Sequence, residues 1–183
     1  MKKTAQVRGA FGRIALALAC VALLSLPVQA AEMTVSAAAS LTNAFTEIKG
    51  MFEKKHAGLQ VNTNYAASNP LLKQIQEGAP VDVFASADQA TMDKAVAAKV
   101  VDPATRKNFA LNDLVLIVPA GSKKPAKLED LKALKRIAIG NPESVPVGRY
   151  TKDSLTNAKL WEAVQPQLIM GNSVRQVRAS SNR

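Results

Sequence analysis

The residues with the clearest chemistry in this chain are serines that directly follow predicted strands, at the points where helices begin. Ser40 follows the alternating pattern of residues 33–37, and Ser68 follows a second such pattern at 59–65. A serine at a helix N-cap places its hydroxyl beside backbone N–H groups that have no partner within the helix. Neutral donors at the positive end of a helix dipole bind small anions without a cationic side chain. Ser40 and Ser68 therefore predict an anion site.

The same arrangement recurs along the chain. Three further predicted strands end in small polar residues: Ser86, the loop from Ser144 to Gly148, and Ser173 with Val174. In open α/β sheets, ligands bind outside the carboxyl ends of the strands. If two lobes face each other, these ends converge on one cleft that closes over a small oxyanion. The plainer alternative, that the serines only cap helices, stays open for Ser173 in particular.

Strands and helices alternate along the chain and position these residues. Alternating or continuous apolar runs predict strands at 33–37, 59–65, 81–85, 114–118, 137–140 and 167–170. Helical spacing predicts helices that begin near Leu41, near Ser68, after the capping residue Asp88, and after the loop 141–148. This alternation favours an α/β architecture with largely parallel sheets. Asn112 and Asp113 mark the predicted crossing between the two lobes.

The first 30 residues have the features of a secretory signal peptide. A basic start is followed by an apolar run from Ile14 to Leu26 and by small residues up to Ala30, so cleavage is predicted after Ala30. Cys20 is the only cysteine, and a lipid anchor there is disfavoured because the apolar run continues past it. A periplasmic protein without disulfides, cysteine metal sites or thiol nucleophiles is expected.

Charge and histidine content argue against two classes of function. The formal net charge is +10, but between the basic ends of the chain Lys and Arg alternate with Asp and Glu, as on a solvated surface. The sequence has no basic stripe with interleaved aromatic residues, so nucleic-acid binding is not predicted. His56 is the only histidine and stands at a predicted helix end. Neither a Ser–His–Asp triad nor a histidine metal cluster is predicted, so an enzyme is not expected.

Three separated motifs resemble the periplasmic molybdate-binding proteins of ABC importers. They are AAASLTNA at 37–44, QIQEGAPVDVFASAD at 74–88 and NPESVPVGRY at 141–150. The resemblance runs in order from about Met33 to Val177. It implies a two-lobed type II periplasmic-binding-protein fold with mostly parallel sheets. It also implies that molybdate, and tungstate as well, is captured for the membrane permease of an ABC importer by a monomer without a cofactor.

The resemblance implies four ligand positions. In the first lobe they are the hydroxyl and N–H groups of Ser40 and Ser68, and in the second lobe the backbone N–H groups of Val147 and Val174. Molybdenum would be bound only as the oxyanion, through these four residues. Donors held at a fixed radius select a tetrahedral oxyanion by size, and a site without acceptors disfavours a protonated phosphate.

The resemblance also divides the chain. The expected parts are a signal peptide at 1–30, lobe 1 at 31–113, part of lobe 2 at 114–177, and a polar tail at 178–183. Family members continue through a helix and a strand that supplies a tyrosine hydroxyl to the oxyanion, and then return to the first lobe. Neither Tyr65 nor Tyr150 stands at that position. The second lobe and the return are therefore expected to be incomplete.

Several alternatives remain beside this interpretation. One is a truncated or frame-shifted copy that folds poorly and binds weakly or not at all. Another is a binding protein for a different oxyanion such as sulfate. The effector domain of an intracellular regulator is disfavoured by the signal peptide and by the lack of a helix-turn-helix pattern, and an enzyme on the same fold by the single histidine.

Overall fold

The computed structural model describes residues 30–180. From Glu32 onward, the described residues form one compact unit. The predicted signal peptide lies outside the described residues except for Ala30, the residue before the predicted cleavage point. Within residues 30–180, no helix is long and apolar enough to span a bilayer.

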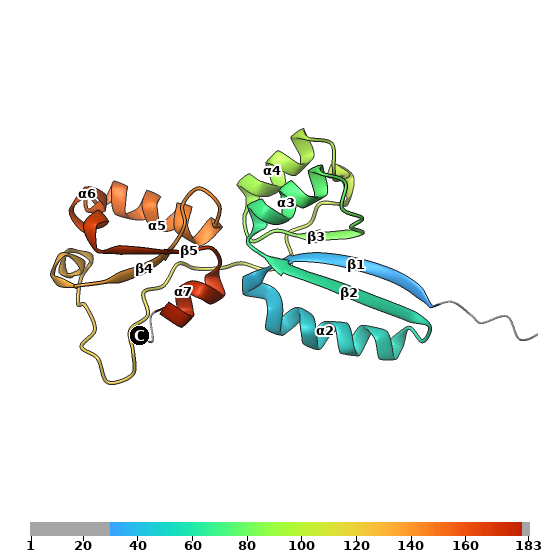
Figure 1. Cartoon of the computed structure of the whole chain (residues 1–183), viewed down its shortest axis with the longest axis horizontal. Coiled ribbons are helices and arrows are strands. Elements are labelled where there is room, and N and C mark those ends of the chain that lie inside the picture. The colour runs from blue at the N-terminus through green and yellow to red at the C-terminus, as the bar shows by residue number, and fades with distance from the viewer. Residues whose placement is uncertain (1–29, 181–183) are drawn as a thin grey trace, which may run out of the picture. The chain divides into compact units, whose positions relative to one another are not determined.

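The first lobe is built on a three-stranded sheet with strand order β2-β1-β3. Its strands are β1 (Ala31–Ala38), β2 (Leu59–Ala66) and β3 (Val83–Ala85). β1 and β3 are parallel, with Val35 opposite Val83. In Figure 1, α2 (Thr42–Lys55) lies on one side of this sheet, and α3 (Ser68–Gln76) and α4 (Gln89–Ala97) lie on the other. We use "first lobe" for the elements from β1 to α4.

The core of the first lobe holds its strand ends in place. Val35, Ala37, Val61 and Ala85 form a buried cluster, against which partly buried side chains such as Phe45 of α2 pack. On α3, Leu71 and Leu72 are 0% and 4% exposed. Burial of one such leucine side chain contributes about 1.5–3 kcal/mol. This packing anchors α3 and therefore the position of Ser68 at its start.

The second lobe is built on two parallel strands, β4 (Ile137–Gly140) and β5 (Leu168–Gly171). Its helices are α5 (Pro146–Asn157), α6 (Trp161–Val164) and α7 (Val174–Ser180). In Figure 1, α5 and α7 lie on opposite sides of the two strands. Leu155, Trp161 and Val164 belong to its buried core. We use "second lobe" for the elements from β4 to α7.

Short 3-10 helices connect these elements. They are η1 (Ala39–Leu41), η2 (Pro103–Thr105), η3 (Leu128–Ala133) and η4 (Gln165–Gln167). η1 leads directly from β1 into α2, and η3 contributes Leu131 to the core of the second lobe. The predicted α/β fold with parallel strand pairing is confirmed.

The prediction of a strand at Leu114–Val118 is wrong. Residues 109–118 have no regular secondary structure, and Val115 and Leu116 are 70% and 51% exposed. None of the described strands pairs with this segment. A strand without a neighbour leaves its N–H and C=O groups without partners, so apolar composition alone does not stabilise it.

Two helices show little burial. Residues 178–180 of the predicted polar tail belong to α7, which packs against β4 and β5 and has no buried residue. In α2, Ile48 is 54% exposed, and none of the residues is buried.

Candidate functional site

Ser40 follows the buried end of β1, but it is not the N-cap that the sequence predicts. It is the middle residue of η1, and Leu41 is the N-cap of α2. The cause is local: Ala38 leaves the strand at φ −54° and ψ 139°, so the turn begins at Ala39. The side chain of Ser40 is exposed. The first N–H groups of a helical segment still lack internal partners, so the donor character of this end is retained.

Ser68 is the first residue of α3 and is fully buried. Its Oγ accepts a hydrogen bond from the N–H of Ala87 at 3.0 Å and does not cap its own helix. A hydroxyl that accepts one bond still has its proton to donate. The bond from Ala87 therefore orients the Ser68 hydroxyl for donation to a second group.

Val147 is the second residue of α5, after the N-cap Val145 and the first helical residue, Pro146. The N–H groups of Gly148 and Arg149 donate to the carbonyl oxygen of Val145 at 3.0 and 3.2 Å. The N–H of Val147 stands one position earlier, where a helix has no internal acceptor. Pro146 carries no N–H, and its fixed φ suits this position. The N–H of Val147 is therefore the first donor that α5 offers.

Val174 is the first residue of α7. The Oγ of Ser173 accepts from the N–H of Gln176 at 3.3 Å, and Oε1 of Gln176 accepts from the N–H of Asn172 at 2.7 Å. This reciprocal pair resembles a capping box. The interpretation of Ser173 as a cap is confirmed, and the N–H of Val174 lies in the turn that it caps.

Hydrogen bonds between the two lobes lie beside the predicted ligands. η1 contacts α7, and Nη1 of Arg175 donates to Oδ1 of Asn43 at 2.9 Å. Nδ2 of Asn69 donates to the carbonyl oxygen of Glu143 at 3.2 Å, close to the starts of α3 and α5. The structure therefore brings the Ser40 region to the Val174 region, and the Ser68 region to the loop before Val147. That all four residues surround one ion stays a prediction.

Sequence reasoning missed an ion pair that also joins the lobes. Asp88 is the N-cap residue of α4, as predicted, but its side chain does not cap the helix. It is fully buried and forms an ion pair with Arg149 of α5. The one local signal was Arg149 itself, because a cation in the first turn of a helix opposes the helix dipole unless it has a partner elsewhere.

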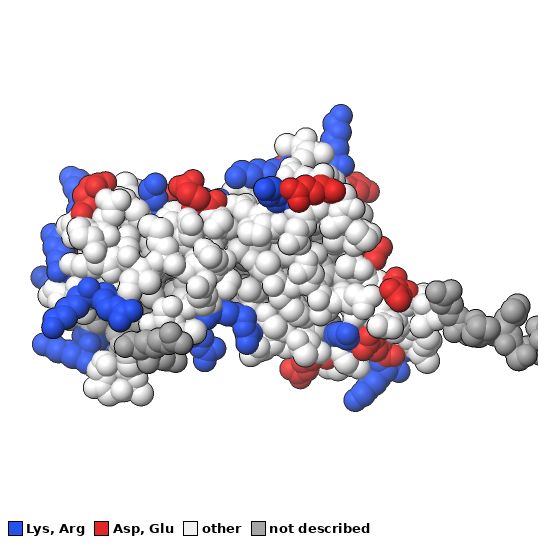
Figure 2. Space-filling model, in the orientation of Figure 1, with Lys and Arg blue, Asp and Glu red and all other residues white. Residues whose placement is uncertain are grey.

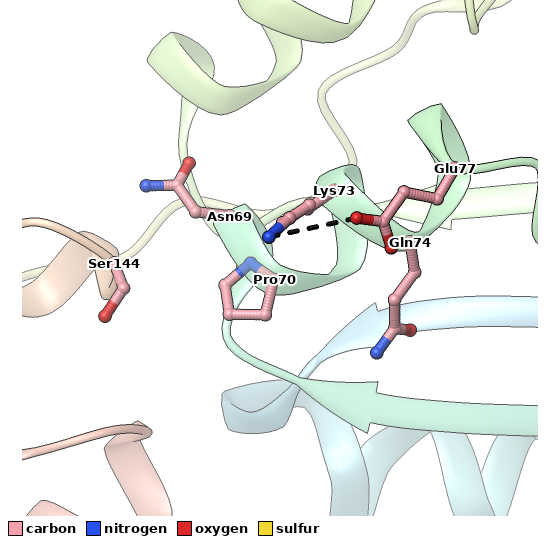
Figure 3. A pocket seen from close by; sticks show the side chains of 6 residues that line it. All are labelled: Asn69, Pro70, Lys73, Gln74, Glu77 and Ser144. Atoms are coloured by element: carbon pink, nitrogen blue, oxygen red, sulfur yellow. Dashed lines mark ion pairs between the residues drawn. The ribbon is translucent and has the colours of Figure 1, made fainter.

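The pocket beside this region is not the predicted anion site. It is lined by Asn69, Pro70, Lys73, Gln74 and Glu77 of α3 and by Ser144 of the loop before α5 (Figure 3). The ammonium of Lys73 is paired with the carboxylate of Glu77 at 3.8 Å. A carboxylate repels an oxyanion, and none of the four predicted ligands lines this pocket.

The remaining polar groups fall outside the predicted ligand set. Within residues 30–180, no group of three or more His, Cys, Asp or Glu side chains is placed to hold a metal ion. Tyr65 packs against the core of the first lobe, and Tyr150 of α5 is 43% exposed. On the face shown in Figure 2, Lys and Arg lie with Asp and Glu around the edges, and a broad area between them carries neither.

The fold and the arrangement of donors define a two-lobed α/β binding protein that offers neutral groups at helix starts. A family model described as bacterial extracellular solute-binding protein matches residues 33–182, and the chain belongs to this family. The predicted periplasmic-binding-protein fold is confirmed by solved structures. One is the periplasmic molybdate-binding protein of Azotobacter vinelandii, with 28% identity, a TM-score of 0.71, and coverage of 82% of this chain and 66% of the other.

Two further proteins are similar to this chain. The molybdate-binding protein ModA of Escherichia coli is 41% identical over 151 residues, which are 79% of this chain and 58% of the relative. The solved substrate-binding domain of a putative molybdenum ABC transporter from Clostridium difficile is 38% identical, with a TM-score of 0.59. The match covers 81% of this chain and 66% of the solved domain. The chain thus spans about six-tenths to two-thirds of the lengths of these proteins.

Proposed function

We propose that this chain is the oxyanion-binding component of an ABC importer and that its ligand is molybdate, with tungstate as a second ligand. The observation that carries this proposal is the pairing of helix starts from opposite lobes. The region of Ser68 meets the loop before Val147 through the bond from Asn69 to Glu143. The similarity to the named molybdate-binding proteins supports the choice of ion.

The chemistry of the predicted donors suits a dianion. Ser40 and Ser68 contribute hydroxyl groups, and Val147 and Val174 contribute backbone N–H groups, so the predicted ligand set consists of neutral donors. Hydrogen bonds to an ionised acceptor are about twice as strong as bonds between neutral groups. Burial of Ser68 strengthens such a bond further, because the local dielectric constant is lower than that of water.

Selection among oxyanions follows from the same geometry. Donors fixed to the backbone cannot follow a smaller ion inward, so sulfate makes longer and weaker bonds than molybdate does. A phosphate that carries a proton needs an acceptor for its O–H group, and the predicted ligand set supplies no carboxylate. The proposed order of affinity is molybdate and tungstate above sulfate, with phosphate lowest.

The remaining parts of the proposal concern the setting. The protein is exported to the periplasm by a signal peptide that is cleaved after Ala30, acts as a monomer, and delivers its ligand to the membrane permease without catalysing a reaction. Residues 31–113 and 114–177 serve as the two lobes that hold the ion. The matching family of extracellular solute-binding proteins supports this setting.

The proposal is tested by calorimetric titration of the purified chain with molybdate, tungstate, sulfate and phosphate at one ionic strength. We expect saturable binding of molybdate and tungstate and at least tenfold weaker binding of sulfate. A thermal melt in each anion gives a second readout, since a ligand that binds only the native state raises the melting temperature. Equal affinity for sulfate would refute the selection by size, and no binding of any of the four would refute the proposed function.

A further inference from the structure

A buried carboxylate of the first lobe is held by a guanidinium of the second. The side chain of Asp88 is 0% exposed, and that of Arg149 is 25% exposed. Nη2 of Arg149 donates to Oδ2 of Asp88. The other carboxylate oxygen, Oδ1, accepts from Oγ of Ser86 at 3.2 Å. Arg149 therefore supplies the positive charge that this buried carboxylate needs.

This ion pair lies between two of the predicted ligands. On the first-lobe side, Asp88 directly follows Ala87, whose N–H fixes the hydroxyl of Ser68. On the second-lobe side, Arg149 lies two positions after Val147 in the same turn of α5. A short chain of covalent and hydrogen-bonded links thus runs from Ser68 to Val147 through the ion pair.

We propose that Arg149 is a positioning residue of the anion site, which holds the donors of Ser68 and Val147 in register across the two lobes by its ion pair with Asp88. This inference rests on the proposed function. Arg149 acts through Asp88 and does not touch the ion. Its role is to make the arrangement in which both lobes contribute donors more stable than an arrangement in which they are apart.

The energetic reason is the burial of Asp88. With the lobes apart, water can solvate the carboxylate and the guanidinium separately. With the lobes joined, the side chain of Asp88 is removed from water, and a buried carboxylate without a partner is strongly unfavourable. Loss of Arg149 therefore penalises the joined arrangement alone. For a ligand that binds only the joined arrangement, the apparent dissociation constant equals the intrinsic one divided by the fraction of molecules in that arrangement. A smaller fraction therefore means weaker binding.

The test compares two arginine substitutions in the purified chain. Arg149→Met removes the guanidinium and keeps an unbranched apolar stem. The matched control is Arg106→Met, because Nη1 of Arg106 is paired with Asp93 of α4 at 2.7 Å, away from the second lobe, and its side chain is 27% exposed, close to the value for Arg149. In calorimetric titrations, we expect Arg149→Met to weaken molybdate binding at least tenfold and Arg106→Met to stay within twofold of the unsubstituted chain.

A double variant separates positioning from general damage. In Asp88→Asn with Arg149→Met, the buried charge is gone together with its partner, so the penalty on the joined arrangement is relieved. We expect this variant to bind molybdate at least threefold more tightly than Arg149→Met alone. No recovery would show that the loss does not come from the unpaired carboxylate, and it would overturn the inference.

Hydrogen exchange of the ligand-free chain keeps the inference separate from the proposed function. We expect the amide of Ala87 and the first turn of α5 to exchange faster in Arg149→Met than in Arg106→Met. If the unsubstituted chain binds none of the tested anions, the proposed function fails, and these exchange rates alone decide whether Arg149 couples the lobes. Affinity within twofold of the unsubstituted chain, or unchanged exchange, in Arg149→Met would overturn the inference and leave the proposed function in place.

Discussion

A Cβ atom added to Gly148 would lie 2.1 Å from the carbonyl oxygen of Gly140. The end of β4 and the first turn of α5 are therefore in direct backbone contact, at a separation that only glycine allows. A Cβ on Gly140 would in turn lie 2.9 Å from the backbone nitrogen of Gly148. This contact fixes where the N–H of Val147 lies relative to the second sheet.

Gly148→Ala is expected to destabilise the chain and weaken anion binding together. The added methyl group meets backbone atoms that cannot rotate away, so α5 has to shift from β4. We expect a loss of about 1–3 kcal/mol in the free energy of unfolding, the usual cost of overpacking. Urea denaturation measures the stability, and calorimetric titration measures the affinity.

Gly50→Ala in α2 is the control for this substitution. Apart from its chain neighbours and the nearby backbone of α2 itself, no atom lies within 4 Å of a Cβ built on Gly50. Alanine is favoured over glycine in a helix interior by about 0.5–1 kcal/mol, so this variant should be slightly more stable than the unsubstituted chain. If both glycine variants behaved alike, the close contact with Gly140 would not be the cause of the loss.

Ser40→Ala and Ser68→Ala are expected to differ in stability although both weaken molybdate binding. Removal of either hydroxyl leaves a charged acceptor short of one donor, at a cost of about 1–3 kcal/mol in binding. Ser68→Ala also removes the acceptor for the N–H of Ala87, which should lower the free energy of unfolding by about 1 kcal/mol. The exposed Ser40 has no comparable structural role, so its variant should melt like the unsubstituted chain.

Ser154→Ala provides the reference for the two serine variants, because Ser154 is an exposed residue of α5. Its affinity for molybdate and its melting temperature should both stay unchanged. Unchanged molybdate affinity in Ser40→Ala would remove Ser40 from the ligand set. A melting temperature of Ser68→Ala equal to that of Ser154→Ala would argue against a stabilising bond from Ala87.

The sequence predicts the elements whose signals are local. The apolar runs at 137–140 and 167–170 correspond to β4 and β5, and the helix predicted after the loop 141–148 is present as α5, which begins earlier, at Pro146. Each of these depends on composition and spacing within a few residues. The helix starts that carry the candidate site could therefore be predicted from the sequence to within about three residues.

Features that depend on distant partners were not predictable in this way. Residues 114–118 have the composition of a buried strand, but strand formation requires a neighbouring strand, which a local pattern does not reveal. Asp88 and Arg149 are 61 positions apart in the chain, so their pairing leaves no periodic signal. The shift of Ser40 from N-cap to the middle of η1 reflects a one-residue difference in where β1 ends, the least reliable kind of boundary.

The exposed apolar segment supports a prediction about solubility. Val115 and Ile117 are 70% and 51% exposed, and unpaired segments rich in β-branched residues favour association between chains. Ile117→Lys should reduce aggregation, measured by light scattering during heating, and leave the melting temperature unchanged. A clear drop in the melting temperature would mean that this side chain is packed in the folded protein.

Leu71→Ala tests the packing that anchors the start of α3. Leu71 has no exposed surface, and removal of a buried leucine side chain costs about 2–5 kcal/mol. Leu111→Ala is the matched control, because Leu111 is 97% exposed and surface substitutions usually change stability by less than about 0.5 kcal/mol. Similar unfolding midpoints for the two variants in urea would contradict the core assignment.

The complete burial of Ser68 also bears on how fast a ligand exchanges. If one ion is held by Ser68 and by a donor of the second lobe, separation of the lobes breaks the bonds from Asn69 to Glu143 and from Arg149 to Asp88 together with the bonds to the ion. These protein–protein bonds then lengthen the residence time of the ion beyond what its own bonds provide. An ion that forms stronger bonds to the two lobes should still leave more slowly, because those bonds break in the same step.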